Sequence, residues 1–495
     1  MKVDRKRHWR LASDAAVHVT VNAVPALFLA AMLVFLVACS RGEDHHDDDL
    51  LSAQQLASDL KYVSSVIESA HPNPFFHEPR QRFEAAITAI QDAAPHGASD
   101  EWLYQHLAPA IAMLGDSHTN LDPYTKAYQE FRNANGRLFP LELRIVNRRI
   151  IVIANYGPER TIPAGAELGS INGLPSGVFV DRIGRFIGAE RSTLRDSRVA
   201  EDVRAYMWHA GMTAPFLVKY YRPDRKMARA HLAGATIASL RAWDNSSAGQ
   251  LAQTPFRICY ARAGAVGVLT VRSFDNPVGW PAFTTHLVEN LKSHGARSLL
   301  IDVRLNSGGG TDTSDMLLRV LAHRRFRDFS AVETKVSGPT KISYGRREYA
   351  GIYGSKAWSS PNGTLLREVG GGWEKPVLAS SAFPGTVFVL VGSGTFSTAA
   401  IFAAAAQDSN TATILGQESG GLATLYGEAF GFTLPVSNLE ASVSTKFFVR
   451  PNGDRAPRGV VPDHALTESA QDAPNDPELD EAISYAFSHT PTVWP

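Results

Sequence analysis

The chain has 495 residues, which suggests about two to four domains, and 44% of its residues are hydrophobic, enough for sizeable cores. This composition excludes disorder of the whole chain. Lys plus Arg and Asp plus Glu balance at 49 each, so the sequence predicts neither a nucleic-acid partner nor an acidic one. Catalysis on small or neutral substrates remains open.

Residues 1–38 are predicted to be a targeting segment and not part of the fold. Basic residues between Lys2 and Arg10 precede an apolar run from Val24 to Ala38, and Cys39 follows directly. The Leu-Val-Ala-Cys end of this run resembles the lipobox of bacterial lipoproteins, which implies cleavage before Cys39, lipidation of its thiol, and a polar tether over residues 39–50. An uncleaved signal anchor is the alternative, although the apolar run is short for a membrane span.

Both interpretations put the bulk of the chain outside the cytoplasm. We therefore expect a protein of the bacterial cell envelope, anchored by lipid and facing the periplasm or the cell surface. Cys259 is then the only cysteine left after Cys39, so no internal disulfide is expected.

Residues 51–135 are predicted to form an N-terminal helical domain. Apolar residues recur at spacings of three and four between Leu56 and Leu114, and a break with three prolines at residues 71–79 separates the first helix from the second. Residues 138–235 contain short β-like runs, including 141–146, 150–154 and 216–221. The stretch 165–177 resembles part of a PDZ domain, and the alternative is an ordinary hairpin with an Asn-Gly turn.

Residues 255–470 have an α/β pattern. Apolar runs of strand length at 266–271, 298–303 and 387–391 alternate with helical periods at 280–293 and 313–322, which predicts a layered sheet covered by helices. Residues 334–378 show little period and are predicted to be irregular. Residues 471–495 are expected to be a last helix and tail, with Asp476 as the helix cap and Pro477 in the first turn.

Ser397 lies where a Val-rich run gives way to an Ala-rich helix. A hydroxyl at a helix N-terminus lies where main-chain N–H groups favour developing negative charge, which suits attack on a carbonyl. Capping of the helix is the alternative role of this serine.

Two other motifs offer groups that a serine nucleophile requires. The strand ending at Asp302 runs into Asn306 and three glycines, whose N–H groups can approach a ligand without obstruction by Cβ. A plain turn is the alternative there, and a phosphate loop is discounted because neither GxxxxGK[ST] nor GxGxxG is present. His118 can accept the serine proton, with Ser117 or Asp116 to orient it, although one of 16 histidines can equally be a packing residue.

A later stretch, 453–463, offers Asp454 and Asp463 as carboxylates but also suits a turn and an edge strand.

Together these motifs resemble the S41 family of serine peptidases, over nearly all of the mature chain. The matching segments, in order, are Asp302–Gly309, Phe396–Phe402, Ala412–Gln417, Leu434–Ser437 and Gly459–Asp463. His71 and Asp116–Thr119 look like the tricorn-like branch of the family.

The resemblance implies an α/β protein with a ClpP/crotonase-like layered catalytic domain beside the helical and PDZ-like domains. It implies Ser397 as nucleophile, His118 as general base, Ser117 as its support, and the N–H groups of Gly309 and Thr398 as the oxyanion hole. The fourth member of the tricorn-like tetrad is a glutamate, which this sequence lacks at the matching place; Asp454 is the substitute there.

The lysine of the processing-peptidase branch is absent, because Leu422 stands at its place and no lysine occurs between Ser397 and Lys446. A Ser-His site is therefore preferred to a Ser-Lys dyad. The expected partner is a peptide or protein substrate, cleaved through an acyl-enzyme, and neither a cofactor nor a metal site is expected. The alternatives are a non-catalytic protein that binds an apolar ligand or peptide on the same scaffold, and an esterase or amidase.

Overall fold

The structure is a computed structural model that describes residues 50–244, 254–378, 381–471 and 475–490. The predicted signal peptide, Cys39 and nearly all of the tether lie outside these residues. No helix within the described ranges combines the length and the apolarity that crossing a membrane requires.

The N-terminal region is helical, as predicted. Its elements are β1 (Leu50–Leu51), α1 (Ala53–Ala70), α2 (Arg80–Ala93), β2 (Ala98–Ser99), α3 (Asp100–Ala112), β3 (Asn120–Leu121) and α4 (Lys126–Asn133). Ser52 begins α1 with a capping box, because its hydroxyl accepts from the N–H of Gln55 while the Gln55 side chain accepts from the N–H of Ser52. The proline-rich break ends α1 at Ala70, where the spacing of the prolines predicts it.

The middle region is an antiparallel sheet with the strand order β4-β5-β6-β8-β9. Its strands are β4 (Leu141–Val146), β5 (Arg149–Asn155), β6 (Glu167–Ile171), β7 (Leu174–Pro175), β8 (Phe216–Tyr221) and β9 (Met227–Leu232). Its helices are α5 (Ser176–Gly184), α6 (Ser192–Glu201), α7 (Val203–His209) and α8 (Ile237–Asp244). Asn172 and Gly173 both have positive φ and join β6 to β7 as the predicted two-residue hairpin turn.

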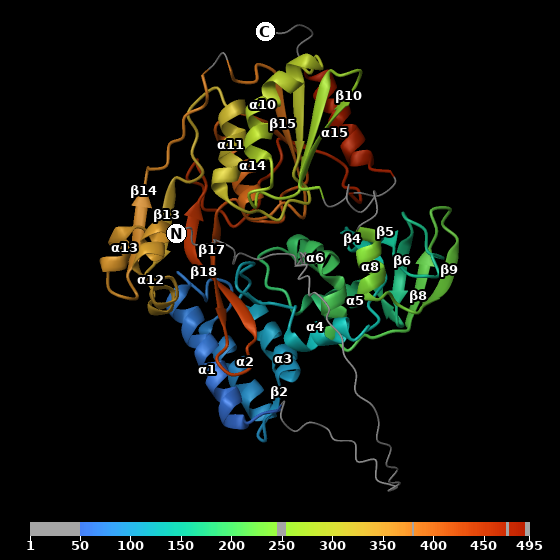
Figure 1. Ribbon diagram of the computed structural model, residues 1–495, viewed down its shortest axis with the longest axis vertical. Coiled ribbons are helices and arrows are strands. Elements are labelled where there is room, and N and C mark those ends of the chain that lie inside the picture. The colour runs from blue at the N-terminus through green and yellow to red at the C-terminus, as the bar shows by residue number, and fades with distance from the viewer. Residues whose placement is uncertain (1–49, 245–253, 379–380, 472–474, 491–495) are drawn as a thin grey trace, which may run out of the picture. The chain divides into compact units, whose positions relative to one another are not determined.

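The C-terminal region is built on a six-stranded sheet of order β10-β11-β12-β15-β16-β19, parallel except for β10 (Figure 1). The strands are β10 (Phe256–Ala261), β11 (Val266–Val271), β12 (Ser298–Asp302), β15 (Thr386–Val391), β16 (Thr413–Gly416) and β19 (His464–Ala465). Three helices cover one face, namely α10 (Trp280–Ser293), α11 (Thr311–Leu321) and α14 (Thr398–Asp408). The last helix, α15 (Pro477–Ser488), covers the other, with Asp476 as its cap as predicted.

Burial on both faces explains why these strands have apolar runs without alternation. In β12, Leu299 and Ile301 pack under the three helices, whereas Leu300 packs under α15. Arg304, just beyond β12, is almost fully buried. It binds the carboxylate of Asp302 at the end of β12 and those of Asp476 and Glu478 at the start of α15. It therefore ties the end of a central strand to the first turn of α15.

The prediction that residues 334–378 are irregular is wrong. They contribute β13 (Ala331–Lys335), α12 (Gly338–Tyr353), α13 (Ser355–Ser359) and β14 (Leu365–Val369). Gly345, at φ 65°, interrupts α12, so the helical period of the sequence is broken where the helix bends. The helices pack through their own small core of Val336, Tyr349, Tyr353 and Ala357.

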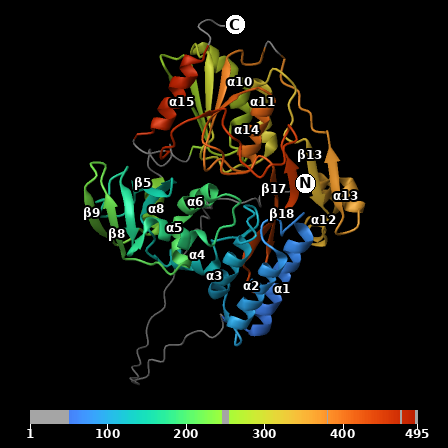
Figure 2. The same ribbon diagram turned by 180° about the vertical axis from the view of Figure 1, so that it is seen from behind.

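A second sheet connects the regions. Its order is β14-β13-β18-β17, with β17 (Leu425–Thr433) and β18 (Glu440–Val449), and the short β3 pairs with β18. Phe430, Leu434 and Val443 of this hairpin share one core with α1. Figure 2 shows the hairpin of β17 and β18 beside that helix. The pairing brings the segment just after His118 alongside a strand that follows Ser397.

Candidate active site

Ser397 lies in the sharp turn between β15 and α14. Its backbone has φ 52° and ψ −125°, a conformation that costs a non-glycine residue free energy and is found mostly at functional sites. It occupies the N-cap position of α14, yet its side chain makes no capping hydrogen bond. Its Oγ instead lies 3.1 Å from Nε2 of His118, so the capping interpretation is wrong.

The loop that carries His118 is held by hydrogen bonds on both sides of the residue. Its N–H donates to Oδ1 of Asp116 at 3.1 Å, and its carbonyl accepts from Oγ of Ser442 on β18 at 2.9 Å. The imidazole stacks on Phe396, with the ring centroids 4.5 Å apart. Contacts within the loop and from two distant segments, at Ser442 and Phe396, therefore hold the residue that meets Ser397.

Burial lowers the pKa of His118 to about 4. The negative charge of Asp116 opposes this shift, whereas the positive charge of Arg198, whose guanidinium lies over the Phe396 ring, adds to it. The carbonyl of Tyr426, like Asp116, favours a higher pKa of His118. Nδ1 of His118 nevertheless makes no hydrogen bond of regular geometry to a described residue. The ring is thus neutral at pH 7, as a proton acceptor must be.

Asp116 connects the His118 loop to the N-terminal helices. Its Oδ2 lies 3.1 Å from Nε2 of His71 and accepts from the hydroxyl of Thr119. Because Nδ1 of His71 accepts from the N–H of Asn73, its Nε2 carries the proton and donates to Asp116. Burial alone would raise the pKa of Asp116, but the hydrogen bonds from His71 and Thr119 lower it, so Asp116 is an ionised carboxylate next to the loop.

The glycine run lies directly against Ser397. A Cβ added to Gly308, at φ 107°, would lie 2.7 Å from Cβ of Ser397 and 3.1 Å from N of Thr398. Neither the N–H of Gly309 nor that of Thr398 donates a hydrogen bond to any residue within the described ranges. The glycine run thus meets Ser397 at Gly308, and an oxyanion hole formed by the N–H groups of Gly309 and Thr398 stays a prediction.

Ser117, the expected support of the His118 ring, has its hydroxyl bound to Glu190. Its Oγ donates to Oε1 of Glu190 at 3.0 Å, and its N–H donates to the same oxygen at 3.3 Å. Burial raises the pKa of Glu190 to about 7, and the charge of Asp116 adds to the shift. Glu190 is a site residue that the sequence did not predict, because nothing in the pattern of residues 188–191 links it to a serine 73 residues upstream.

Asp454 has its partners elsewhere. Its carboxylate accepts from the N–H of Ala456 at 2.9 Å and from Arg458 at 2.7 Å. Among the residues that the structure describes, it makes no hydrogen bond to Ser397, His118 or Ser117. Its role as fourth member of the site stays a prediction without a supporting contact.

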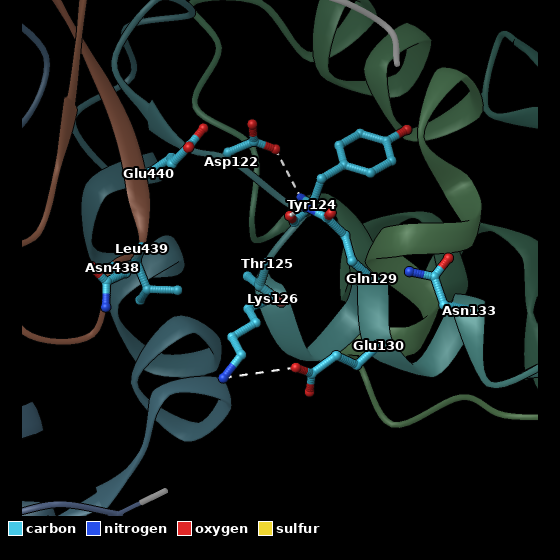
Figure 3. A pocket seen from close by; sticks show the side chains of 10 residues that line it. All are labelled: Asp122, Tyr124, Thr125, Lys126, Gln129, Glu130, Asn133, Asn438, Leu439 and Glu440. Atoms are coloured by element: carbon cyan, nitrogen blue, oxygen red, sulfur yellow. Dashed lines mark hydrogen bonds and ion pairs between the residues drawn. The ribbon is translucent and has the colours of Figure 1, made fainter. Parts of the chain in front are cut away.

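A pocket lies beyond β3, between the segment that leads into α4 and the turn that joins β17 to β18 (Figure 3). Asp122, Lys126 and Glu440 are among its lining residues, and Lys126 forms an ion pair with Glu130 inside it. Neither Ser397 nor His118 lines this pocket. This pocket is therefore separate from the contact between Ser397 and His118.

A hydroxyl in contact with a neutral imidazole is equipped for acyl transfer, the chemistry of serine hydrolases. Residues 265–466 match the model of peptidase family S41. The match includes the Ser397 turn and the glycine run, although His118 lies outside it. No curated protein matches the sequence.

Solved structures share the fold. A mutant of CPAF superposes with a TM-score of 0.64 at 15% identity, over 88% of this chain and 95% of that one. Mature CPAF complexed with lactacystin gives a TM-score of 0.62 at 15% identity, over 88% of this chain and 97% of that one. At such low identity these matches show a common fold alone. The protein is a serine-type peptidase. Its residues 265–466 form a domain that is similar to peptidase family S41.

Proposed function

We propose that the protein hydrolyses peptide bonds through an acyl-enzyme formed on Ser397, with His118 as the general base. The observation that carries the proposal is the 3.1 Å contact between Oγ of Ser397 and Nε2 of His118. An alcohol is a poor nucleophile until a neighbour takes its proton, and a neutral imidazole in contact with it can do so.

The steps follow from the positions of the groups. Oγ of Ser397 attacks the carbonyl carbon of the substrate while its proton passes to Nε2 of His118. The N–H groups of Gly309 and Thr398 stabilise the oxyanion of the tetrahedral intermediate. His118 then protonates the leaving amine, which departs, and a water activated by the same histidine hydrolyses the acyl-enzyme.

A fluorophosphonate probe tests this assignment without knowledge of the natural substrate. We expect the probe to label the folded protein at Ser397, and Ser397→Ala to abolish labelling. His118→Ala should slow labelling by about 100- to 10,000-fold, the usual contribution of a general base. His286→Ala is the matched control, because His286 is exposed on α10 and, among the described residues, its ring pairs with Glu289 alone. Labelling of His118→Ala at the wild-type rate would refute the assigned base.

The regional assignments belong to the same proposal. We propose that residues 255–470 have ClpP/crotonase-like layering, supported by the sheet with helices on both faces. We propose that residues 138–235 are PDZ-like and bind an extended segment of the substrate, a role supported by the hairpin at Asn172 beside an antiparallel sheet.

Lipid anchoring at Cys39 is proposed from the sequence, with the protein facing the periplasm or the cell surface. Cys39→Ser removes the thiol that would be lipidated. We expect the wild-type protein in the membrane fraction of cells and its N-terminal peptide to carry the mass of a lipid. Recovery of wild-type and Cys39→Ser proteins in the same fraction would contradict the anchor.

A further inference from the structure

Both hydrogen-bond donors of Ser117 converge on one carboxylate oxygen of Glu190, at 3.0 Å from Oγ and 3.3 Å from N. The hydroxyl proton of Ser117 is therefore committed to Glu190 and is not available to the ring of His118. Ser117 and His118 are adjacent, so a carboxylate that fixes one fixes the main chain that carries the other.

The segment around Glu190 packs tightly on the same loop. The N–H of Gly188 donates to Oδ1 of Asn120 at 2.8 Å, and Nδ2 of Asn120 donates to the carbonyl of Ser117 at 2.9 Å. A Cβ on Gly188 would lie 2.8 Å from the carbonyl oxygen of Asp116, so the two backbones approach as closely as glycine allows. The segment that joins α5 to α6 thus packs directly against the loop that carries Ser117 and His118.

The residues that follow Glu190 contact segments that lie near Ser397. Arg191 forms an ion pair with Glu418, which also accepts from the N–H of Gly459 at 2.8 Å. Arg198, on α6, lies with its guanidinium 4.6 Å from the centroid of Phe396, the residue before Ser397. One segment of the middle region therefore contacts the loops that carry both the serine and the histidine.

We propose that Glu190 is a positioning residue of the peptidase, which acts through Ser117 to hold the His118 loop against Ser397. The inference rests on the proposed function of Ser397 and His118. It assigns to Glu190, from the middle region, the role of a carboxylate that supports the loop of the general base.

The surroundings of Glu190 support a role beyond packing. Its second oxygen, Oε2, is buried and has no hydrogen-bond partner within the described ranges, a state that costs free energy in a purely structural residue. The charged group that faces it is Asp116, on the same loop. A buried carboxyl with one free oxygen, held beside a second carboxylate, is the kind of strained arrangement that occurs at functional sites.

The test measures the rate at which the fluorophosphonate probe labels Ser397 in the full-length protein. Glu190→Ala removes the acceptor, and we expect labelling to slow by about 10- to 100-fold, as for loss of a hydrogen bond to a charged group. Glu190→Gln keeps an oxygen that can accept from both donors and should stay within about 3-fold of the wild type. Glu289→Ala, which removes a surface contact with His286 on α10, is the control and should label within about 2-fold of the wild type.

A double-mutant cycle shows whether Glu190 acts through Ser117. If it does, Ser117→Ala combined with Glu190→Ala labels no more slowly, within about 2-fold, than the slower single variant. Circular dichroism confirms that each variant is folded, and Glu190→Met repeats the test if the alanine variant is not. This substitution keeps the volume but accepts no hydrogen bond.

Two results would overturn the inference: labelling of both Glu190→Ala and Glu190→Met at the wild-type rate, or independent, multiplicative effects in the cycle. Failure of the proposed function is a different result. In that case the wild-type protein does not label, or Ser397→Ala labels as fast as it does.

Discussion

The low pKa of His118 predicts that the peptidase stays active in mild acid. The base works only when neutral, so the rate of labelling at Ser397 falls as the pH falls through the pKa of His118. An ordinary histidine, with a pKa of about 6.5, is only about 9% neutral at pH 5.5. A histidine with a pKa of about 4 is about 97% neutral there, so the expected rate at pH 5.5 is about 10-fold higher than an ordinary histidine would give.

The assay is the fluorophosphonate labelling rate between pH 4 and pH 8, with circular dichroism at each pH. Unfolded His118 binds a proton near pH 6.5 but folded His118 only near pH 4, so stability falls as the pH drops through that window, by on the order of 3 kcal/mol. Glu190 has a pKa of about 7 and faces Ser117 and Asp116, so the profile is measured in Glu190→Gln as well. A midpoint near pH 6.5 in both folded proteins would refute the argument that burial keeps His118 neutral.

Two further substitutions test the supports of the site. Gly308→Ala adds a Cβ 2.7 Å from Cβ of Ser397 at a φ of 107°, so we expect labelling to fall by at least about 100-fold while the protein stays folded. An alanine variant that labels within about 2-fold of the wild type would contradict this close approach of the two backbones. Arg304→Met leaves Asp302 and Glu478 buried without their cation. We expect urea unfolding to show a loss of about 3–5 kcal/mol, whereas Arg346→Met, on the exposed side of α12, should change stability by less than about 0.5 kcal/mol. Equal losses in the two variants would show that the buried ion network does not stabilise the fold.

Much of the fold was predictable because its strands and helices have clear periods. The strand at 266–271 and the helix at 280–293 begin and end where the apolar pattern predicts. The turn at Ser397 and the glycine run were predictable for a different reason, since each follows a buried strand directly and the ends of parallel strands meet at one edge of a sheet.

The remaining features depend on contacts between segments far apart in the chain. His118 meets Ser397 across 279 residues, because β3 pairs with β18, and a two-residue strand leaves no period in the sequence. Glu190 reaches Ser117 from a loop whose backbone geometry depends on Gly188. The sequence pattern did not predict α12, because the bend at Gly345 interrupts the helical period halfway along the helix.

Arg304 links the glycine run to a helix far away in the sequence. It lies where β12 gives way to that run, and two of its three carboxylate partners, Asp476 and Glu478, stand at the start of α15, 172 and 174 residues further along. Undocking α15 from the sheet would therefore leave the buried guanidinium with fewer counter-charges beside the segment that leads to Ser397. The rigidity of the glycine run is in this way coupled to the packing of α15.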